Sequence, residues 1–327
     1  MTSQSKPKAF WQRFCLSLLA CGLAAGGALA QDYPAKSVRL VDPYAPGGST
    51  GVVSRILARK FQEQTRQSLV VDNRPGAGSN IGSDIAAKST PDGYTILLGT
   101  SSLAINASLY RVMTFDPIKD LAPIVAVISA PNVLAVDASL PINSVKDLID
   151  YARANPTKLN YGSSGNGATN HMAMEMLKTM AGVQIAHIPY KGGGEAMAAL
   201  LARNIQVMFN PASSLSPHAK SGRLRLLAVT SDKRVEGLAL PTVSETLPGF
   251  ESSVWFGLFA PAGTPAPIID KLNAEFNRAL NDKETMDILQ GAGMTVVGGS
   301  VEQMKNLLAR DTTRWAAVVK ASGAKVD

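Results

Sequence analysis

One arrangement occurs twice in the chain and limits the folds open to it: a short apolar segment, a loop rich in Gly, Ser and Thr, and an amphipathic segment. The first copy comprises Ser37–Tyr44, the loop Ala45–Thr50 and the helical pattern of Thr50–Gln64. The second comprises Lys158–Gly162, the loop Ser163–Thr169 and a helix from about Asn170 to Met180. Short apolar strands that alternate with helices are typical of parallel βαβ units. The sequence therefore predicts an α/β fold.

The other segments extend this alternation. Further short strands are expected at Ser68–Asp72, Tyr94–Gly99, Gln184–Pro189, Val207–Asn210 and Arg225–Thr230. Near the C-terminus, the strand Val254–Ala260 is followed by three expected helices, at Pro265–Asn281, Lys283–Gly291 and Ser300–Ser322. Ser144 has the sequence context of an N-cap, and the spacing of Ser300 and Gln303 is that of a capping box. A chain of 327 residues is long enough for two domains, each with its own core.

The N-terminal thirty residues have the three parts of a secretory signal peptide. Lys6, Lys8 and Arg13 precede an apolar run, which ends in Ala-Leu-Ala at Ala30. The run is shorter than the roughly 20 residues that span a bilayer, which argues against a membrane anchor. We expect cleavage after Ala30 and a periplasmic mature protein. The alternative is a lipoprotein signal processed at Cys21, which ends the sequence Leu-Leu-Ala-Cys.

Removal of this segment changes the charge and the cysteine content. The 32 basic residues lose three and become 29, against 25 acidic residues, so the net charge falls from +7 to +4. Both cysteines leave with the signal, so the mature chain has no disulfide. The remaining basic residues are scattered and form no stripe or reader motif, which argues against nucleic-acid binding. The later apolar segment Leu121–Val136 is interrupted by two prolines and an asparagine, so no membrane span is expected there.

The two Gly/Ser loops have the composition of anion sites. The first turn of a helix has backbone N–H groups without intrahelical partners, and the helix dipole adds partial positive charge there. Glycine lets a ligand approach that backbone, and Ser or Thr hydroxyls add donors, so such a loop can hold a carboxylate or a phosphate. Either loop alone could equally be an ordinary turn with capping hydroxyls. Two such loops without charged side chains favour a cleft that holds an anion from both sides.

Enzymatic alternatives find less support in the sequence. Gly47–Gly51 matches the nucleophile elbow of serine hydrolases, with Ser49 as nucleophile, but it follows the first strand, whereas further strands precede the elbow in that architecture. Gly76–Gly82 lacks the third glycine of the dinucleotide fingerprint, and there is no phosphate-binding P-loop sequence. The three histidines, His171, His187 and His218, lack the spacing of metal ligands. We therefore expect no catalytic residue, no metal and no cofactor.

Seven segments in order resemble one known family, the periplasmic solute receptors of tripartite tricarboxylate transporters, also called the Bug family. In the first half they are Pro43–Thr50 (PYAPGGST), Val70–Gly82 (VVDNRPGAGSNIG), Pro91–Gly99 (PDGYTILLG) and Ile105–Tyr110 (INASLY). In the second half they are Leu159–His171 (LNYGSSGNGATNH), His187–Met197 (HIPYKGGGEAM) and Trp255–Pro265 (WFGLFAPAGTP). The resemblance runs from about Tyr33 to Asp327, and the order and spacing of the motifs make it specific.

The resemblance implies a two-lobed, type-II periplasmic binding fold with a hinge of crossing strands. Lobe one would comprise residues 31–130 and 255–327, and lobe two residues 131–254, with Val125–Val136 and Val254–Ala260 crossing between them. In the family, backbone amides, hydroxyls and waters of the two loops hold a ligand carboxylate. The corresponding residues here are Tyr44, Ala45, Gly48, Ser49, Thr50, Ser163, Ser164, Gly167, Ala168, Thr169 and His171. Ser101, Ser102, Lys191 and Asn210 would lie near the far end of the ligand.

Two departures from the family bear on the ligand. Many members have an acidic residue where this chain has Gly51, and another where it has Asn210. Their absence argues against a ligand that is recognised through an ammonium group. The resemblance implies a monomeric receptor that binds a small carboxylate and delivers it to the membrane subunits of a transporter. The alternatives are an exported hydrolase that uses Ser49 and a receptor that senses the ligand for a signalling partner.

Overall fold

The computed structural model describes residues 33–231, 233–235, 238–322 and 325–326. The expected signal peptide, with Cys21 and the cleavage site after Ala30, lies outside the described residues. Residues Met1–Ala35 and Lys36–Asp327 form separate units, and all that follows concerns the second. In the described part of the chain, no helix has the length and apolar character needed to cross a membrane.

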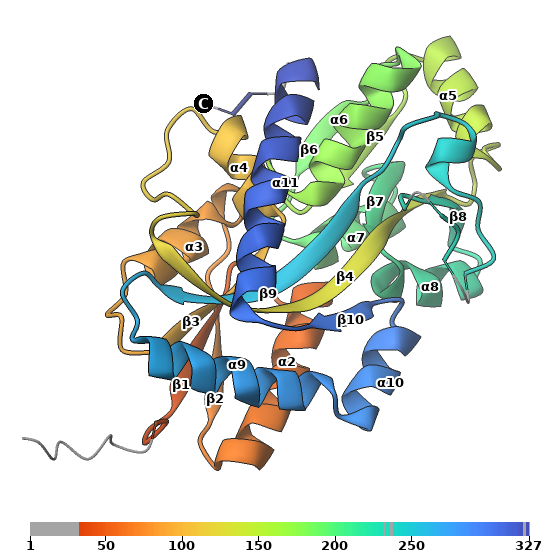
Figure 1. Ribbon diagram of the computed structural model, residues 1–327. Coiled ribbons are helices and arrows are strands. Elements are labelled where there is room, and N and C mark those ends of the chain that lie inside the picture. The colour runs from red at the N-terminus through yellow and green to blue at the C-terminus, as the bar shows by residue number, and fades with distance from the viewer. Residues whose placement is uncertain (1–32, 232, 236–237, 323–324, 327) are drawn as a thin grey trace, which may run out of the picture. The chain divides into compact units, whose positions relative to one another are not determined.

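The strands form one mixed sheet, in the order β2-β1-β3-β9-β4-β7-β5-β6, with β8 and β10 also paired to β4 (Figure 1). Their bounds are β1 Val38–Asp42, β2 Leu69–Asn73, β3 Thr95–Thr100, β4 Leu121–Asp137, β5 Asn160–Ser163, β6 Ala186–Pro189, β7 Val207–Pro211, β8 Leu224–Val229, β9 Ser253–Pro261 and β10 Thr295–Gly298. As the alternation of strands and helices predicts, β1 is parallel to β2 and β3, and β5 is parallel to β6 and β7. The α/β class is confirmed.

The 17-residue strand β4 joins the two halves of the sheet. Residues 121–131 pair antiparallel with β9, and residues 132–137 pair with β7 and β8. The yellow β4 and the cyan β9 run alongside each other through the centre of Figure 1. Both segments that we expected to cross between lobes, Val125–Val136 and Val254–Ala260, fall within these two strands.

Ten α-helices connect the described strands. They are α2 Ser49–Thr65, α3 Asn80–Ala87, α4 Ser102–Leu109, α5 Val145–Ala154, α6 Thr169–Ala181, α7 Gly193–Leu201, α8 Ala212–Lys220, α9 Ala266–Leu280, α10 Lys283–Gly291 and α11 Val301–Ser322. The predicted caps are present: Ser144 accepts a hydrogen bond from the backbone N–H of Asp147, and Ser300 and Gln303 form a reciprocal capping box. The helices α5 and α11 therefore begin where their capping residues predict.

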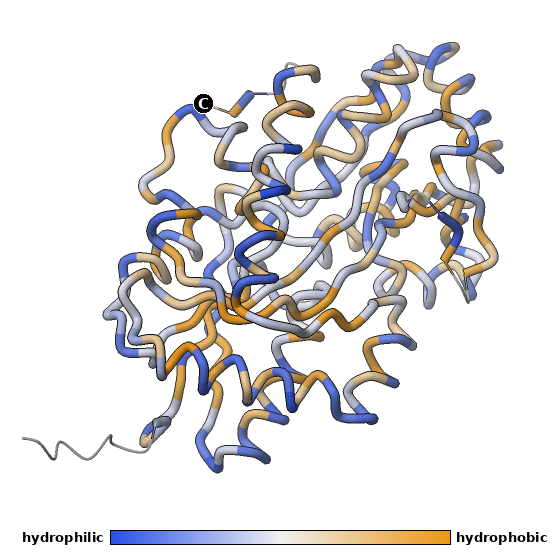
Figure 2. The backbone as a smooth tube through the Cα atoms, viewed as in Figure 1, coloured by the Kyte–Doolittle hydropathy of each residue, from blue (hydrophilic) through white to orange (hydrophobic). Residues whose placement is uncertain are grey.

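Each half of the sheet has its own apolar core. Leu97, Phe259 and Trp315 belong to a cluster on the first half, and Tyr161 and Phe209 to a cluster on the second. In Figure 2 the strands β1 to β3 are largely orange, whereas the outer helices carry alternating blue and orange residues, as amphipathic helices do. The arrangement places the C-terminal ends of β1 and β5, with the loops that follow them, at the boundary between the halves.

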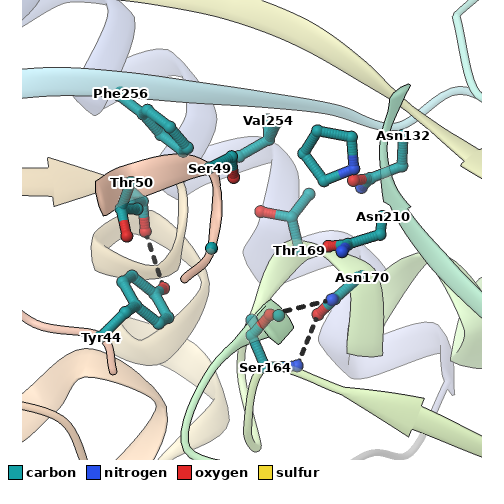
Figure 3. A pocket seen from close by; sticks show the side chains of 15 residues that line it. Tyr44, Ser49, Thr50, Asn132, Ser164, Thr169, Asn170, Asn210, Val254 and Phe256 are labelled. Carbon is teal, nitrogen blue, oxygen red and sulfur yellow. Dashed lines mark hydrogen bonds between the residues drawn. The ribbon is translucent and has the colours of Figure 1, made fainter. Parts of the chain in front are cut away.

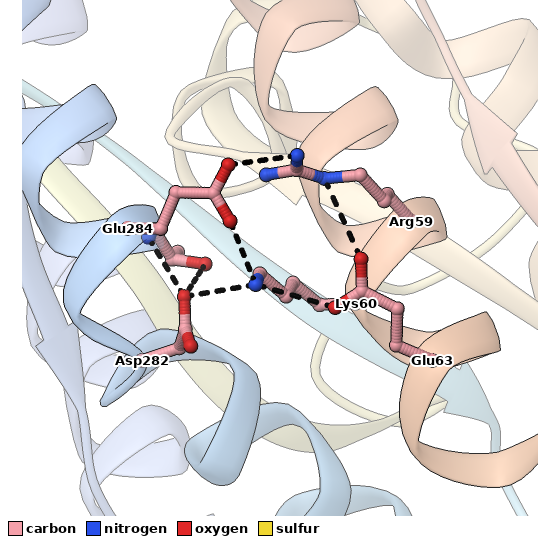
Figure 4. Close-up of polar contacts among 6 residues, drawn as sticks. Arg59, Lys60, Glu63, Asp282 and Glu284 are labelled. Carbon is pink, nitrogen blue, oxygen red and sulfur yellow. Dashed lines mark hydrogen bonds and ion pairs between the residues drawn. The ribbon is translucent and has the colours of Figure 1, made fainter.

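An ion-pair cluster ties the distal half of α2 to α10 (Figure 4). The ammonium group of Lys60 lies 3.0 Å from carboxylate oxygens of both Asp282 and Glu284, and 3.2 Å from Glu63. Arg59 also contacts Glu284, at 2.8 Å. The hydrogen bonds that Lys60 donates to Glu284 and Asp282 raise its pKa, so it stays charged. The cluster fixes the helix whose other end forms the candidate site.

Candidate functional site

A cavity of about 50 Å³ lies between the two halves of the sheet (Figure 3). The first half and the strand β9 contribute Tyr44, Gly48, Ser49, Thr50, Thr100, Val254 and Phe256. The second half and the strand β4 contribute Asn132, Ser164, Ala168, Thr169, Asn170, Gly193, Asn210 and Pro211. Among these lining residues none carries a charged side chain, although hydroxyl and amide groups are frequent. The walls are therefore polar but uncharged.

The N-terminus of α2 forms one wall of the cavity. Its N-cap is Gly48, which has an extended conformation (φ −88°, ψ −178°) and no side chain that could cap the helix. Gly48, Ser49 and Thr50, from the N-cap and the first turn, line the cavity. The backbone N–H groups of the first helical turn have no intrahelical acceptor, so this end of α2 can hold an anion.

The N-terminus of α6 forms the opposite wall. Its N-cap is Ala168, again without a capping side chain, and Ala168, Thr169 and Asn170 line the cavity. The preceding loop turns at Gly165 (φ +117°) and Gly167 (φ +82°), conformations that favour glycine. A Cβ atom at Gly167 would lie 1.8 Å from Oδ1 of Asn106 on α4, so the loop can approach α4 because this residue is glycine.

Two further helices begin at the cavity. Gly193, the first residue of α7, and Pro211, the N-cap of α8, both line it. Neither helix has a side chain that caps its N-terminus. Four helices thus direct their N-terminal ends to one small volume, where each contributes partial positive charge. An uncharged cavity with this surrounding can hold an anion.

Tyr44 closes the cavity on the side of the first half. Its hydroxyl lies 3.0 Å from Oγ1 of Thr100 and 2.8 Å from Oγ of Ser102. Burial raises the pKa of Tyr44, so the phenol stays protonated. A protonated phenol with two hydroxyl neighbours gives the wall a fixed pattern of hydrogen bonds and no charge.

A stack of aromatic rings supports the Ser163–Gly167 loop from behind. The rings of His171 and His187 are 4.3 Å apart, and those of His187 and Tyr161 are 4.6 Å apart. Nδ1 of His171 accepts the backbone N–H of Gly167, and Nε2 of His187 lies 2.7 Å from Oγ of Ser163. Burial lowers the pKa of His171 to about 4 and that of His187 to about 3. Both imidazoles are therefore neutral at neutral pH, as the acceptor role of His171 requires.

A buried carboxyl group lies beside the first wall. Asp42, at the end of β1, is fully buried; it accepts hydrogen bonds from Oγ of Ser54 at 3.0 Å and from the backbone N–H of Tyr44 at 3.2 Å. Burial raises the pKa of Asp42 to about 6, despite these hydrogen bonds. Asp42 therefore interacts with the same helix, α2, whose N-terminus faces the cavity.

The structure brings most of the predicted site residues together. Eight of them line the cavity: Tyr44, Gly48, Ser49, Thr50, Ser164, Ala168, Thr169 and Asn210. Seven others lie around it without lining it: Ala45, Ser101, Ser102, Ser163, Gly167, His171 and Lys191. The sequence reasoning missed seven lining residues, namely Thr100, Asn132, Asn170, Gly193, Pro211, Val254 and Phe256. Asn170 and Gly193 sit within quoted motifs, whereas Asn132 lies on a crossing strand without a motif.

The seven remaining residues have contacts of their own; Oγ of Ser102 lies 2.8 Å from the hydroxyl of Tyr44. Ser101 donates to and accepts from the backbone of Trp255, which ties β3 to β9. Ser163 and His171 belong to the network behind the loop, and Gly167 packs against Asn106. The backbone N–H of Ala45 donates to the carbonyl of Lys191 at 3.3 Å, which links the two halves beside the cavity.

The arrangement offers Ser49 no general base. No histidine lines the cavity with it, and His187 is paired with Ser163 instead. Ser163 is fully buried and bonded to the backbone of Gly165 as well, so it has no path to a substrate. Around the described cavity, the geometry required for a Ser-His nucleophile is absent.

Comparisons with known proteins agree with the geometry. Residues 53–324 match the family model described as "Tripartite tricarboxylate transporter family receptor". The Bordetella pertussis protein BugT is 37% identical over 301 residues, which cover 91% of this chain and 92% of that protein. Two solved structures are similar over the whole fold. Rpa4515 of R. palustris with adipate has a TM-score of 0.87 and 37% identity, covering 90% of this chain and all of that chain. MatC of Rhodopseudomonas palustris with bound malate has a TM-score of 0.85 and 27% identity, covering 88% and 100%.

Proposed function

Because the chain belongs to the receptor family of the tripartite tricarboxylate transporters, we propose that it captures a small organic carboxylate and delivers it to the membrane subunits of such a transporter. It has the two-lobed α/β fold of the periplasmic binding proteins. The observation that carries the proposal is the cavity itself. Four helices without capping side chains begin at it, and none of its described lining residues has a charged side chain. The related proteins bound to adipate and malate support a carboxylate as the ligand.

The ligand carboxylate lies between the first turns of α2 and α6. Backbone N–H groups and the hydroxyls of Ser49, Thr50 and Thr169 donate to it. Each hydrogen bond to a charged group contributes roughly 1.5–3 kcal/mol, so four or five suffice for roughly micromolar affinity after the ordering and closure costs. No step of this function requires a bond to be broken, so the protein acts by binding and not by catalysis.

The two lobes close around the ligand about a hinge at β4 and β9. Lobe one comprises residues 31–130 and 255–327, and lobe two residues 131–254. Two hydrogen bonds join the lobes and stabilise the closed form: the hydroxyl of Tyr110 donates to the carbonyl of Asn166 at 3.1 Å, and the backbone N–H of Ala45 donates to the carbonyl of Lys191. A ligand that touches both lobes favours the closed form. The receptor acts as a monomer after export and cleavage of its signal peptide behind Ala30.

Calorimetry of the mature chain with carboxylic acids and their methyl esters tests the proposal. The ester lacks the anion and should bind at least about tenfold more weakly than its acid, since one charge-assisted hydrogen bond contributes roughly 1.5 kcal/mol or more. Equal affinity of acid and ester would refute an anion site at the helix N-termini. N-terminal sequencing of the exported protein should begin at Gln31; an acylated Cys21 would show lipoprotein processing instead.

A further inference from the structure

Asn210 presents a hydrogen-bond acceptor to the cavity. Its Nδ2 lies 2.8 Å from Oγ of Ser214, and that hydroxyl lies 2.9 Å from the carbonyl of Pro211. The carbonyl can only accept, so the hydroxyl proton of Ser214 is used there, and its oxygen must accept from Asn210. This fixes the orientation of the amide. Among the residues that the structure describes, none donates to Oδ1 of Asn210, although the side chain lines the cavity and is only 4% exposed.

Asn132 has a free donor at the same wall. Its side chain is 1% exposed and lines the cavity, and its Nδ2 has no hydrogen-bond partner within the described part of the chain. Its backbone is fixed, because its N–H donates to Oγ1 of Thr230 at 2.8 Å and its carbonyl accepts from the N–H of Thr230 at 2.9 Å. A buried amide donor without a partner costs free energy, which a ligand acceptor at this wall would recover.

The two amides are neighbours on adjacent strands. β4 pairs with β7 in a register that places Asn132 opposite Pro211 and Val133 opposite Asn210. Figure 3 shows both side chains on the same side of the cavity, facing Thr50 and Tyr44 across it. Over the described residues, the lining thus includes one amide with an unpaired donor, Asn132, and one with an unpaired acceptor, Asn210, and no charged side chain.

We propose that Asn132 and Asn210 together recognise a hydroxyl group of the ligand, so that the receptor prefers hydroxycarboxylates to the corresponding unsubstituted acids. This inference rests on the proposed function. A hydroxyl both accepts from Asn132 and donates to Asn210. An ammonium group has no lone pair for the Asn132 donor, and a second carboxylate would face the oxygen of Asn210. A site built to hydrogen-bond a hydroxyl rejects analogues without it, because its buried polar groups then lose their partners.

Matched pairs of acids that differ by one hydroxyl test the proposal. Calorimetry of the mature chain with lactate against propionate, and with malate against succinate, gives the ratio of the two affinities in each pair. We expect the hydroxy acid to bind at least about tenfold more tightly in one pair or both. The variants Asn132→Leu and Asn210→Leu should each bring this ratio towards one, because they weaken the binding of the hydroxy acid more than that of the unsubstituted acid.

Two isosteric variants and a control separate specificity from folding. Asn132→Asp replaces the donor by an acceptor, and Asn210→Asp adds a negative charge; both keep the side-chain shape and should weaken the binding of all four acids. Thr169→Val, at another point of the wall, should change both members of a pair equally and leave the ratio unchanged. A ratio near one in the wild type, or one that survives both Asn→Leu changes, would overturn the hydroxyl proposal and leave carboxylate binding intact. If none of the four acids binds, the proposed function itself fails.

Discussion

The buried carboxyl group of Asp42 should make the chain less stable as the pH rises. Its pKa is 3.8 in an unfolded chain and about 6 in the fold, because burial disfavours the charged form. Above pH 6 the folded protein must hold an ionised, desolvated carboxylate. A rise of the pKa from 3.8 to about 6 corresponds to about 3 kcal/mol of lost stability. This loss is absent below pH 3.8 and complete above about pH 7. Between pH 4.5 and 7.5, about 2 kcal/mol of it develops.

Asp42→Asn removes this titration, so the free energy of unfolding of the variant relative to the wild type should rise by about 2 kcal/mol from pH 4.5 to 7.5. Urea unfolding of the mature chain, followed by the fluorescence of the buried Trp255 and Trp315, measures it. Subtracting the free energy of unfolding of the wild type at each pH removes the contributions of the other titrating groups. Comparing this difference at the two pH values removes any pH-independent cost of the amide. Asp72→Asn is the control with the opposite sign, because the hydrogen bonds and charges of Arg39 and Arg74 outweigh burial and lower the pKa of Asp72. If the stability difference for Asp42→Asn is the same at both pH values, Asp42 is not the strained acid that the structure indicates.

Three further outcomes follow from particular contacts. Gly167→Ala should lower the melting temperature with or without ligand, because alanine is strained at the left-handed φ of this position; its Cβ would also collide with Asn106 across the boundary between the lobes. Calorimetric melting measures the change. Tyr110→Phe removes the hydrogen bond to Asn166 between the lobes and should make closure less favourable by roughly 1 kcal/mol, so that less compaction on ligand addition is seen in small-angle scattering. Unchanged compaction would show that this contact does not hold the lobes closed. His187→Gln should reduce the acid sensitivity of the melting temperature between pH 7 and 5. Burial lowers the pKa of His187 to about 3, so the wild type loses stability as the pH falls below 6.5, where the unfolded imidazole takes up a proton.

Periodicity and capping residues predicted the elements that are both amphipathic and clearly delimited. The helix Lys283–Gly291 has the predicted bounds, and α11 begins one residue after Ser300, as its capping box requires. The strand β10 and the helices α3, α4 and α8 were not predicted. β10 has four residues at an edge of the sheet, and α8 contains Pro217, which reads as a turn residue in sequence. Short edge strands and helices stabilised by tertiary contacts carry little signal of their own.

The candidate site likewise contains residues that could be predicted from the sequence and residues that could not. The loop residues of α2 and α6 could be found because glycine and hydroxyl residues before a helix have a direct chemical meaning. Asn132, Val254 and Phe256 could not, because the direction of Asn132 depends on the pairing of β4 with β7, and those of Val254 and Phe256 on the pairing of β9 with β4. The pairing of β4 with β9 shifts register between Pro123 and Val125 and again between Ala126 and Ile128. Such irregularities break the alternation of faces, so the sequence does not show which side chains of the crossing strands point into the cavity.

The two Gly/Ser loops look equivalent in sequence, but glycine has a different role in each. Gly167 is left-handed, which strains any residue with a side chain whether or not a ligand is bound, and it lies against Asn106 of the opposite lobe, so it is required both for the loop and for the contact between the lobes. Gly48 has φ −88°, which any residue adopts, and a Cβ there would lie 3.8 Å from the backbone nitrogens of both Gly193 and Gly194. The side chain of any other residue would therefore extend into the space between the first turns of α2 and α7. Gly48 keeps open the gap between α2 and α7 beside the proposed anion site, and its conformational freedom is not what this position requires. The first loop can thus be altered to test binding alone, whereas changes in the second test the fold as well.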